Sequence, residues 1–207
     1  MYVAREPLPE AALPNIRTAT PADARALADL HLETLAVSDL SPLGPFQVRR
    51  FYANAIARGA ATVCVAEEDG ALLGFVMITP DIGAMFPRAL LAGPLDTALF
   101  VLGSNPVGLA RAVLAKLGSG TAVPPSVPEL VYLGVRASAR GKGVGGALME
   151  AAHAAFRAQG IAEYELNVHA DNASAVRLYE SHGLTVRRRF EKAGRTLHTM
   201  GRRLDDA

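Results

Sequence analysis

The sequence predicts an α/β protein of the α+β type, in which helices pack against a mixed β-sheet. Two observations lead to this fold class. The last third of the chain alternates strand, helix, strand and helix before two final strands, and an earlier pair of strands flanks the turn residues Glu68, Asp69 and Gly70. The first pattern is typical of a strand–helix–strand unit, and the second is typical of an antiparallel hairpin. Together they indicate a sheet that contains both strand orientations.

The bulk composition supports one compact domain. The chain has 207 residues, is 50% hydrophobic and carries a formal net charge of +1. This balanced charge gives no support to a nucleic-acid partner, and no apolar stretch is long enough for a membrane-spanning helix. The single cysteine, Cys64, excludes an internal disulfide framework. We therefore expect a cytoplasmic protein with a proline-rich arm at 1–14, followed by a single domain at 15–207.

The elements of the first half follow from cap and turn residues. A helix begins with Thr20 as its N-cap and Pro21 as its first residue, and its apolar stripe predicts that it continues to the turn at 41–45. The other elements expected here are a first strand, a second helix and the hairpin, over 15–20, 46–59 and 61–80.

The segment 81–128 interrupts this regular pattern. Many glycines and prolines surround its apolar pieces, which indicates a packed insertion with one or two helices. The chain then becomes regular again. The elements expected after the insertion are a strand, a helix, a strand, a helix and two terminal strands, over 129–135, 144–159, 162–168, 172–183, 184–190 and 196–204.

The stretch VYLGVRASARGKGVGGALMEAA, from Val131 to Ala152, places four glycines and two cations at the start of a helix. Because glycine has no side chain, successive backbone N–H groups can converge on phosphate oxygens. The helix adds about half a positive charge at its N-terminus, and Arg140 and Lys142 add full charges. The stretch is therefore predicted to bind a phosphate-containing ligand.

Three phosphate-binding motifs compete for this loop. A Walker loop requires Ser or Thr after its lysine, whereas Lys142 is followed by Gly143. The dinucleotide pattern Gly-x-Gly-x-x-Gly is present as Gly141, Gly143 and Gly146, but its first glycine lies too far beyond the preceding strand. The third motif is Arg/Gln-x-x-Gly-x-Gly/Ala, which residues 140–145 match. An NAD(P)-binding protein stays open as the less favoured alternative.

The third motif resembles the acyl-CoA pyrophosphate loop of the GNAT superfamily of N-acetyltransferases. The resemblance extends to HADNASAVRLYESHGL, in which Asn172 opens a helix and Tyr179 follows about two turns later. The opening IRTATPADARALADLH is also similar to the first strand and helix of the family. The resemblance covers residues 15 to about 80 and 129 to about 203. It implies a mixed, mostly antiparallel sheet of about seven strands, flanked by helices and splayed at its central strands.

The resemblance also implies a ligand and a reaction. The acetyl group of acetyl-CoA would be transferred directly to an amine in a ternary complex, and this chemistry requires no metal. The residues placed against acetyl-CoA belong to one strand, the glycine loop and one helix start: Leu133, Gly134, Val135, Arg140, Gly141, Lys142, Gly143, Val144, Gly145, Gly146 and Asn172.

Amine acetylation requires a base, because a lysine-like amine has a pKa near 10.4 and its deprotonation costs about 4.6 kcal/mol at pH 7. Glu129 is the candidate, since the strand matches a pattern of the histone-acetylating branch, in which a glutamate opening this strand is the base. Glu129 and Val135 share strand parity, which predicts that both side chains point to one face. Tyr179 is the candidate general acid for the leaving thiolate. The alternative interpretations are an ordinary surface glutamate and a core tyrosine.

The acceptor cannot be identified from these residues beyond a small-molecule or peptide amine. We expect it to bind between the first two helices and the insertion at 81–128. A non-catalytic acyl-CoA-binding or regulatory module is the alternative function, because such a module would keep the glycine loop and lose the acceptor chemistry. The arginine-rich terminal hairpin is a candidate surface for a homodimer.

Overall fold

The computed structural model describes residues 14–36, 38–90, 93, 98, 127–192 and 194–204. The predicted arm at 1–14 lies outside these residues except for Pro14, and so does most of the insertion predicted at 81–128. Within these ranges, no helix combines the length and the apolar character needed to cross a membrane.

A seven-stranded sheet organises the described residues, in the order β1-β2-β3-β4-β5-β7-β6. All neighbouring strands are antiparallel except β4 and β5, which are parallel. The predicted mixed, mostly antiparallel sheet is therefore confirmed. The strands are β1 Asn15–Thr18, β2 Thr62–Glu68, β3 Ala71–Thr79, β4 Glu129–Val135, β5 Glu163–His169, β6 Thr185–Lys192 and β7 Arg195–Arg203.

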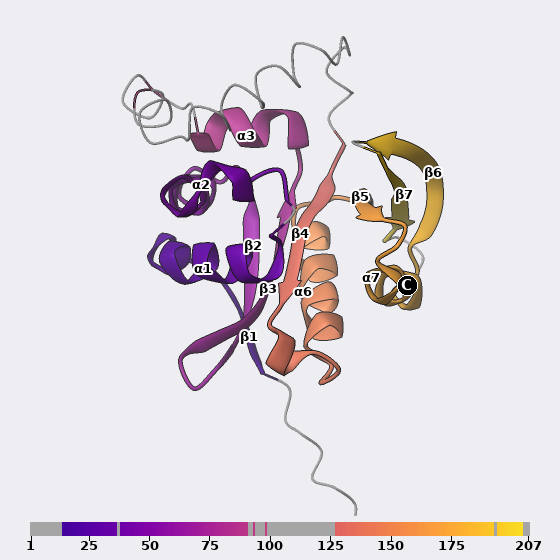
Figure 1. Cartoon of the computed structure of the whole chain (residues 1–207), viewed down its shortest axis with the longest axis horizontal. Helices are drawn as coiled ribbons and strands as arrows, with labels where there is room; N and C mark the ends of the chain where they lie inside the picture. Colours follow the sequence, from indigo (N-terminus) through magenta and orange to yellow (C-terminus); the bar gives the residue numbers. More distant parts are fainter. Residues whose placement is uncertain are drawn as a thin grey trace, which may run out of the picture.

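Helices cover both faces of the sheet. Figure 1 shows α1 and α2 on one side of β2, β3 and β4, and α6 on the other side. Each side has its own hydrophobic cluster. The cluster under α1 and α2 contains Phe75 and Met77, and the cluster under α6 contains Val76 and Ile78. We call these two sides the α1–α2 face and the α6–α7 face. The helices are α1 Ala24–Thr34, α2 Pro45–Ala57, α3 Ile82–Leu90, α6 Val144–Ala158 and α7 Ala173–Ser181.

Helix α1 begins as predicted but ends earlier. The Thr20 N–H donates to the Asp23 carboxylate at 2.7 Å, which completes a capping box at the start of the helical segment. The helix ends at Thr34, not at the turn that begins at residue 41. Beyond it, the Ser41 hydroxyl donates to the Leu35 carbonyl at 2.8 Å. Such local side-chain hydrogen bonds offer the backbone an alternative to the helix.

A β-bulge interrupts the pairing of β4 with β3. Tyr132 lies opposite Met77 and Leu130 lies opposite Ile78, so Val131 is an extra residue in β4. An extra residue on one strand reverses the alternation of side chains beyond it. The bulge therefore decides which face of the sheet each β4 residue occupies.

The bulge places Glu129 and Val135 on opposite faces. Glu129 shares the α1–α2 face with Tyr132, which packs against the hydrophobic cluster of that side. Leu133 and Val135 pack against the cluster on the α6–α7 face. The prediction that Glu129 and Val135 point to one face is wrong. It assumed that side chains alternate without interruption along β4, and the extra residue Val131 reverses that alternation.

Gly134 lies where α1 approaches β4. A Cβ atom at this position would stand 2.4 Å from Thr34 Oγ1 and 2.8 Å from Phe75 Cε1. We expect Gly134→Ala to lower the free energy of unfolding by about 1–3 kcal/mol, because overpacking forces these neighbours to move. Adding Thr34→Ala removes the nearer contact and should recover part of the loss. Denaturant unfolding of the single and double variants measures both effects, and strictly additive losses would contradict this explanation.

Candidate functional site

The predicted phosphate loop forms the entrance to α6. A short 3-10 turn, Ala137–Ala139, follows β4, and the chain then passes through Gly141 and Gly143 with φ of 74° and 81°. Gly143 is the N-cap of α6, and no side chain of the described residues caps this helix. The first intrahelical hydrogen bond runs from Ala147 N to Gly143 O at 3.0 Å. The N–H groups at 144–146 therefore have no acceptor within the helix.

The loop is open and basic. Residues 140–143 are exposed, and the first turn of α6 contains no acidic residue. The Arg140 Nε donates to the Val135 carbonyl at 3.1 Å, which holds this guanidinium at the end of β4. Val144 is buried and anchors the start of α6 in the hydrophobic cluster. Free N–H groups, a helix N-terminus and two cations together form an anion-binding arrangement.

The sheet is split between its central strands. β4 and β5 pair only where Glu129 lies opposite Glu165, next to a hydrogen bond from Glu165 N to Pro128 O at 3.0 Å. Beyond this point, no further pairing joins the described residues of these two strands. The predicted splay is therefore present, and we call the opening the β4–β5 gap.

The backbone of β4 turns polar groups toward this gap. The Arg136 N–H donates to the Leu73 carbonyl of β3 at 2.8 Å. Because hydrogen-bonding direction alternates along an antiparallel strand, Gly134 turns its N–H and C=O to β3. Leu133 and Val135 turn theirs to the gap, where the Val135 carbonyl accepts the hydrogen bond from Arg140. An extended ligand could be bound there in the manner of an added strand.

Tyr179 lies on the α6–α7 face of the sheet. Its side chain is 7% exposed and belongs to the hydrophobic cluster that also contains Val168 and Leu184. Burial raises the pKa of its hydroxyl to about 12. The phenol is therefore protonated at neutral pH and available as a hydrogen-bond donor.

Asn172 is the N-cap of α7, as its position predicts. Its side-chain oxygen accepts hydrogen bonds from the Ala175 N–H at 3.2 Å and the Ser174 hydroxyl at 3.1 Å. This cap fixes the start of α7 relative to the end of β5. A contact between Asn172 and a ligand stays a prediction.

Glu129 lies at the narrow end of the β4–β5 gap, on the α1–α2 face. Asn167 Nδ2 donates to its carboxylate at 3.3 Å. Burial raises the pKa of Glu129 to about 6, and the neighbouring Glu165 carboxylate adds to this effect. The Asn167 hydrogen bond and the charge of Lys192 act in the opposite direction. A carboxylate with this pKa is mostly ionised at pH 7 and still able to accept a proton.

The loop between α1 and α2 is held against β4 by a buried histidine. His31 Nδ1 lies 2.8 Å from the Tyr52 hydroxyl, and Nε2 lies 2.7 Å from the Ser38 hydroxyl. The His31 ring also meets the Tyr132 ring edge-on at 4.8 Å. Burial lowers the pKa of His31 to about 4, so the ring is neutral at physiological pH. This network positions the loop residue Asp39 beside the site.

The turn between β6 and β7 forms a bridge that sequence reasoning missed. Lys192 Nζ contacts Asp39 of the α1–α2 loop at 2.7 Å, and Arg195 contacts Asp171 of the β5–α7 loop at 2.9 Å. These two ion pairs thus connect the turn to the α1–α2 loop and to the β5–α7 loop. The sequence signals a turn at this point, but the pairing of charges so far apart in the chain has no local signature.

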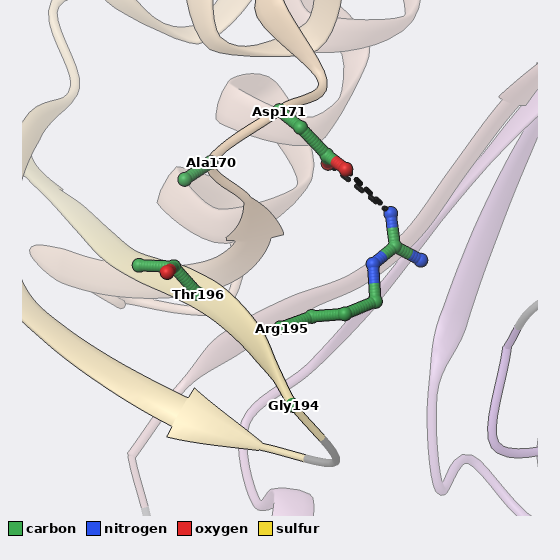
Figure 2. Close-up of a pocket in the computed structure, with 5 residues that line it drawn as sticks. All are labelled: Ala170, Asp171, Gly194, Arg195 and Thr196. Carbon is green, nitrogen blue, oxygen red and sulfur yellow. Dashed lines mark hydrogen bonds and ion pairs between the residues drawn. The ribbon is translucent and has the colours of Figure 1, made fainter.

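Figure 2 shows a pocket where this turn meets the end of β5, with Arg195 reaching from β7 to Asp171. The pocket has a volume of about 260 Å³. It is lined by residues of the β5–α7 loop, the β6–β7 turn and the start of β7: Ala170, Asp171, Gly194, Arg195 and Thr196. The Lys192–Asp39 contact also brings the β6–β7 turn to the loop between the first two helices. The contribution predicted for the insertion at 81–128 lies outside the described residues apart from α3.

Comparison with known proteins matches this architecture to one family. The family model described as the acetyltransferase (GNAT) family matches residues 26–184, which include β4, the glycine loop, α6 and α7. No curated relative matches the sequence.

Solved structures share the fold at low sequence identity. An N-acetyltransferase from Staphylococcus aureus Mu50 has a TM-score of 0.63 and 16% identity, covering 94% of this chain and 100% of its own. The protein yncA from Salmonella typhimurium, solved with its cofactor acetyl-CoA, has a TM-score of 0.63 and 18% identity, with coverage of 95% and 96%. The ribosomal-protein-alanine N-acetyltransferase from Brucella melitensis has a TM-score of 0.62 and 20% identity, with coverage of 91% and 99%.

Proposed function

The chain belongs to the acetyltransferase (GNAT) family, and from this premise we propose that it transfers the acetyl group of acetyl-CoA directly to an amine in a ternary complex. One observation carries the proposal. The β4–β5 gap joins the two faces of the sheet, with the uncapped start of α6 on one face and the Glu129 carboxylate on the other. Two substrates that approach from opposite faces could therefore meet in the gap.

The α6–α7 face suits the donor substrate. The N–H groups at 144–146, with Arg140 and Lys142 nearby, would bind the diphosphate of acetyl-CoA. The backbone groups of Leu133 and Val135 would then pair with the amides of the pantetheine arm along the open edge of β4. This route leads the thioester from the α6 entrance into the gap, toward Tyr179.

The α1–α2 face suits the acceptor amine. Glu129 and Tyr132 lie on this face of β4, and the Asp39–Lys192 ion pair borders it. We propose a small-molecule or peptide amine as the acceptor. The Brucella protein described above is named for the acetylation of a ribosomal-protein alanine. A peptide N-terminus is therefore one acceptor to test.

The chemistry assigns one proton step to each of two side chains. The amine nitrogen forms a bond to the acetyl carbon as the bond from that carbon to sulfur breaks. Glu129 accepts the amine proton, directly or through water, and releases it to solvent. Tyr179 donates a hydrogen bond or a proton to the departing sulfur and is reprotonated by solvent. With a pKa of about 12, Tyr179 is a weak acid but remains in its donor form at every working pH.

Release of free thiol from acetyl-CoA tests this function. We expect turnover with at least one member of a panel of amines, amino acids and peptide N-termini. Activity should fall as pH drops through about 6, because Glu129 becomes protonated and can no longer act as a base. The Glu129→Gln variant should lose this acid limb together with about 100-fold of the rate at pH 7. Retention of the limb in that variant would contradict the role of Glu129.

Ligand binding and thermal stabilisation, measured beside turnover, separate the alternatives. Tight binding of acetyl-CoA without turnover on any amine would favour a non-catalytic acyl-CoA-binding module. Stabilisation against heat by NAD(P)H and not by CoA would favour a dinucleotide-binding protein. The 3-10 turn Ala137–Ala139, which separates β4 from the glycines, argues against the latter, because a dinucleotide loop follows its strand directly.

A further inference from the structure

We infer that Asn167 and Thr199 form a hydrogen-bonded relay that holds the Glu129 carboxylate in place across the β4–β5 gap. This inference rests on the proposed function, in which Glu129 is the base. Asn167 and Thr199 would be positioning residues, since they act through Glu129 and need not touch the substrates.

The relay is built from residues that lie opposite one another on the α1–α2 face. Asn167 of β5 is the register partner of Thr199 of β7, which is in turn the partner of Arg188 of β6. The Thr199 hydroxyl donates to Asn167 Oδ1 at 2.9 Å, and Asn167 Nδ2 donates to Glu129 Oε1 at 3.3 Å. Arg188 approaches the Thr199 oxygen at 3.5 Å from the outer strand. One residue from each of four strands thus forms a continuous chain that ends on the carboxylate.

The relay has a defined direction. Arg188 can only donate, so its contact uses the oxygen lone pairs of Thr199 and leaves the hydroxyl proton for Asn167. A hydroxyl that donates to Oδ1 fixes the orientation of the amide, which then presents its N–H group to Glu129. Without this constraint the amide could rotate and present its oxygen to a carboxylate, which is repulsive. The buried Thr199, at 2% exposure, therefore decides how the exposed Asn167 side chain is oriented.

Glu129 needs this support because of where it lies. β4 and β5 separate immediately after Glu129 and Glu165, so no continuing ladder fixes the carboxylate beyond this point. Among the described residues, Asn167 is the side chain that donates a hydrogen bond to it. The charged and titratable groups that face Glu129 are Glu165 of β5, Lys192 of β6 and Tyr132 of β4.

Three variants of the full-length chain test the relay. Asn167→Ala removes the donor to Glu129, and Thr199→Val removes the hydroxyl at nearly constant volume. Thr199→Ser keeps the hydroxyl and tests rescue. Thr185→Val provides a matched control, because it makes the same substitution on β6 at an exposed position. Thermal unfolding identifies any variant that fails to fold.

Two readouts are used. The first is the pH profile of kcat/KM with the best amine of the panel. The second is the titration of isotope-labelled glutamate carboxyl groups by NMR, in which Glu129→Gln assigns the Glu129 signal. The titration requires no turnover, so it reports on the relay even if the enzyme assay fails.

We expect Asn167→Ala and Thr199→Val to lower kcat/KM at pH 6 by about tenfold, the effect of losing one hydrogen bond to a charged group. The pKa of Glu129 should rise in both variants, because the Asn167 hydrogen bond lowers it, and the acid limb should move to higher pH with it. The KM for acetyl-CoA should not change in either variant. The kcat/KM and the pKa of Glu129 in Thr199→Ser and Thr185→Val should match those of the wild type.

The two proposals fail in different ways. An unchanged titration of Glu129 in both Asn167→Ala and Thr199→Val would overturn the relay. Full activity of Glu129→Gln would overturn the base, and with it the catalytic role of the relay, even if the titration shifted. A loss of activity in Thr199→Val that Thr199→Ser does not rescue would show that Thr199 matters for packing and not for its hydroxyl.

Discussion

Removing the Tyr179 hydroxyl (Tyr179→Phe) is expected to lower kcat about 100-fold, the usual contribution of a general acid, while the KM for acetyl-CoA changes little. The ring should stay in its hydrophobic cluster, and no hydrogen bond joins the Tyr179 hydroxyl to another of the residues that the structure describes. The free energy of unfolding should therefore stay close to that of the wild type. Steady-state kinetics and denaturant unfolding of the same preparation measure both quantities.

Tyr164 provides the matched control for this variant. It is also a buried tyrosine of the α6–α7 face, but its hydroxyl lies 2.8 Å from Nε2 of the buried His153. Tyr164→Phe should lower the free energy of unfolding by about 1–3 kcal/mol, because it leaves a buried ring nitrogen without its partner. Its kcat should not change. Equal kcat losses in Tyr179→Phe and Tyr164→Phe would mean that Tyr179 affects the reaction only through packing.

Placing a carboxylate at the start of α6 is expected to weaken acetyl-CoA binding about 100-fold. In Gly143→Asp the new charge would lie within a few ångströms of the bound diphosphate, where like charges repel by a few kcal/mol in a partly exposed site. Isothermal titration calorimetry measures the change in Kd. The repulsion should weaken as salt is added, because the loop is exposed and the charges are screened.

Gly143→Asn separates this charge effect from backbone strain. Gly143 has φ of 81°, and asparagine and aspartate are the side chains that best tolerate this left-handed region. Both variants therefore carry similar strain, and they differ in one formal charge. Gly143→Asn should bind acetyl-CoA within about tenfold of the wild type. The anion site at α6 would be refuted if the two variants bound acetyl-CoA equally.

Local signals in the sequence correctly predicted most of the elements. The Thr20 cap, the Asn172 cap and the Asp69–Gly70 turn are each present as expected. The strand predicted over 129–135 has these bounds in the structure. The end of α1 was predicted too late in the chain. Serine hydrogen bonds in the following loop set where the helix ends, and no helix-stop residue does so.

The residues of the candidate site differ in how visible they are in the sequence. The glycine loop and Tyr179 belong to contiguous stretches of the chain, and their pattern is visible in the sequence. The α1–α2 face of the gap combines Glu129, Asn167 and the β6–β7 turn, which are far apart in the chain. Their meeting depends on strand order and register, which a single sequence does not display.

The sequence by itself determined where helices and strands begin and which loop exposes its N–H groups, because capping, glycine conformation and hydrophobic periodicity act over a few neighbouring residues. Only the tertiary structure decided which face of the sheet Glu129 occupies and which side chain donates a hydrogen bond to it. The bulge at Val131 and the register of β5 with β7 arise from packing between distant segments. A shift of one residue in a strand moves every later side chain to the other face, so the face that Glu129 occupies could be assigned only from the fold.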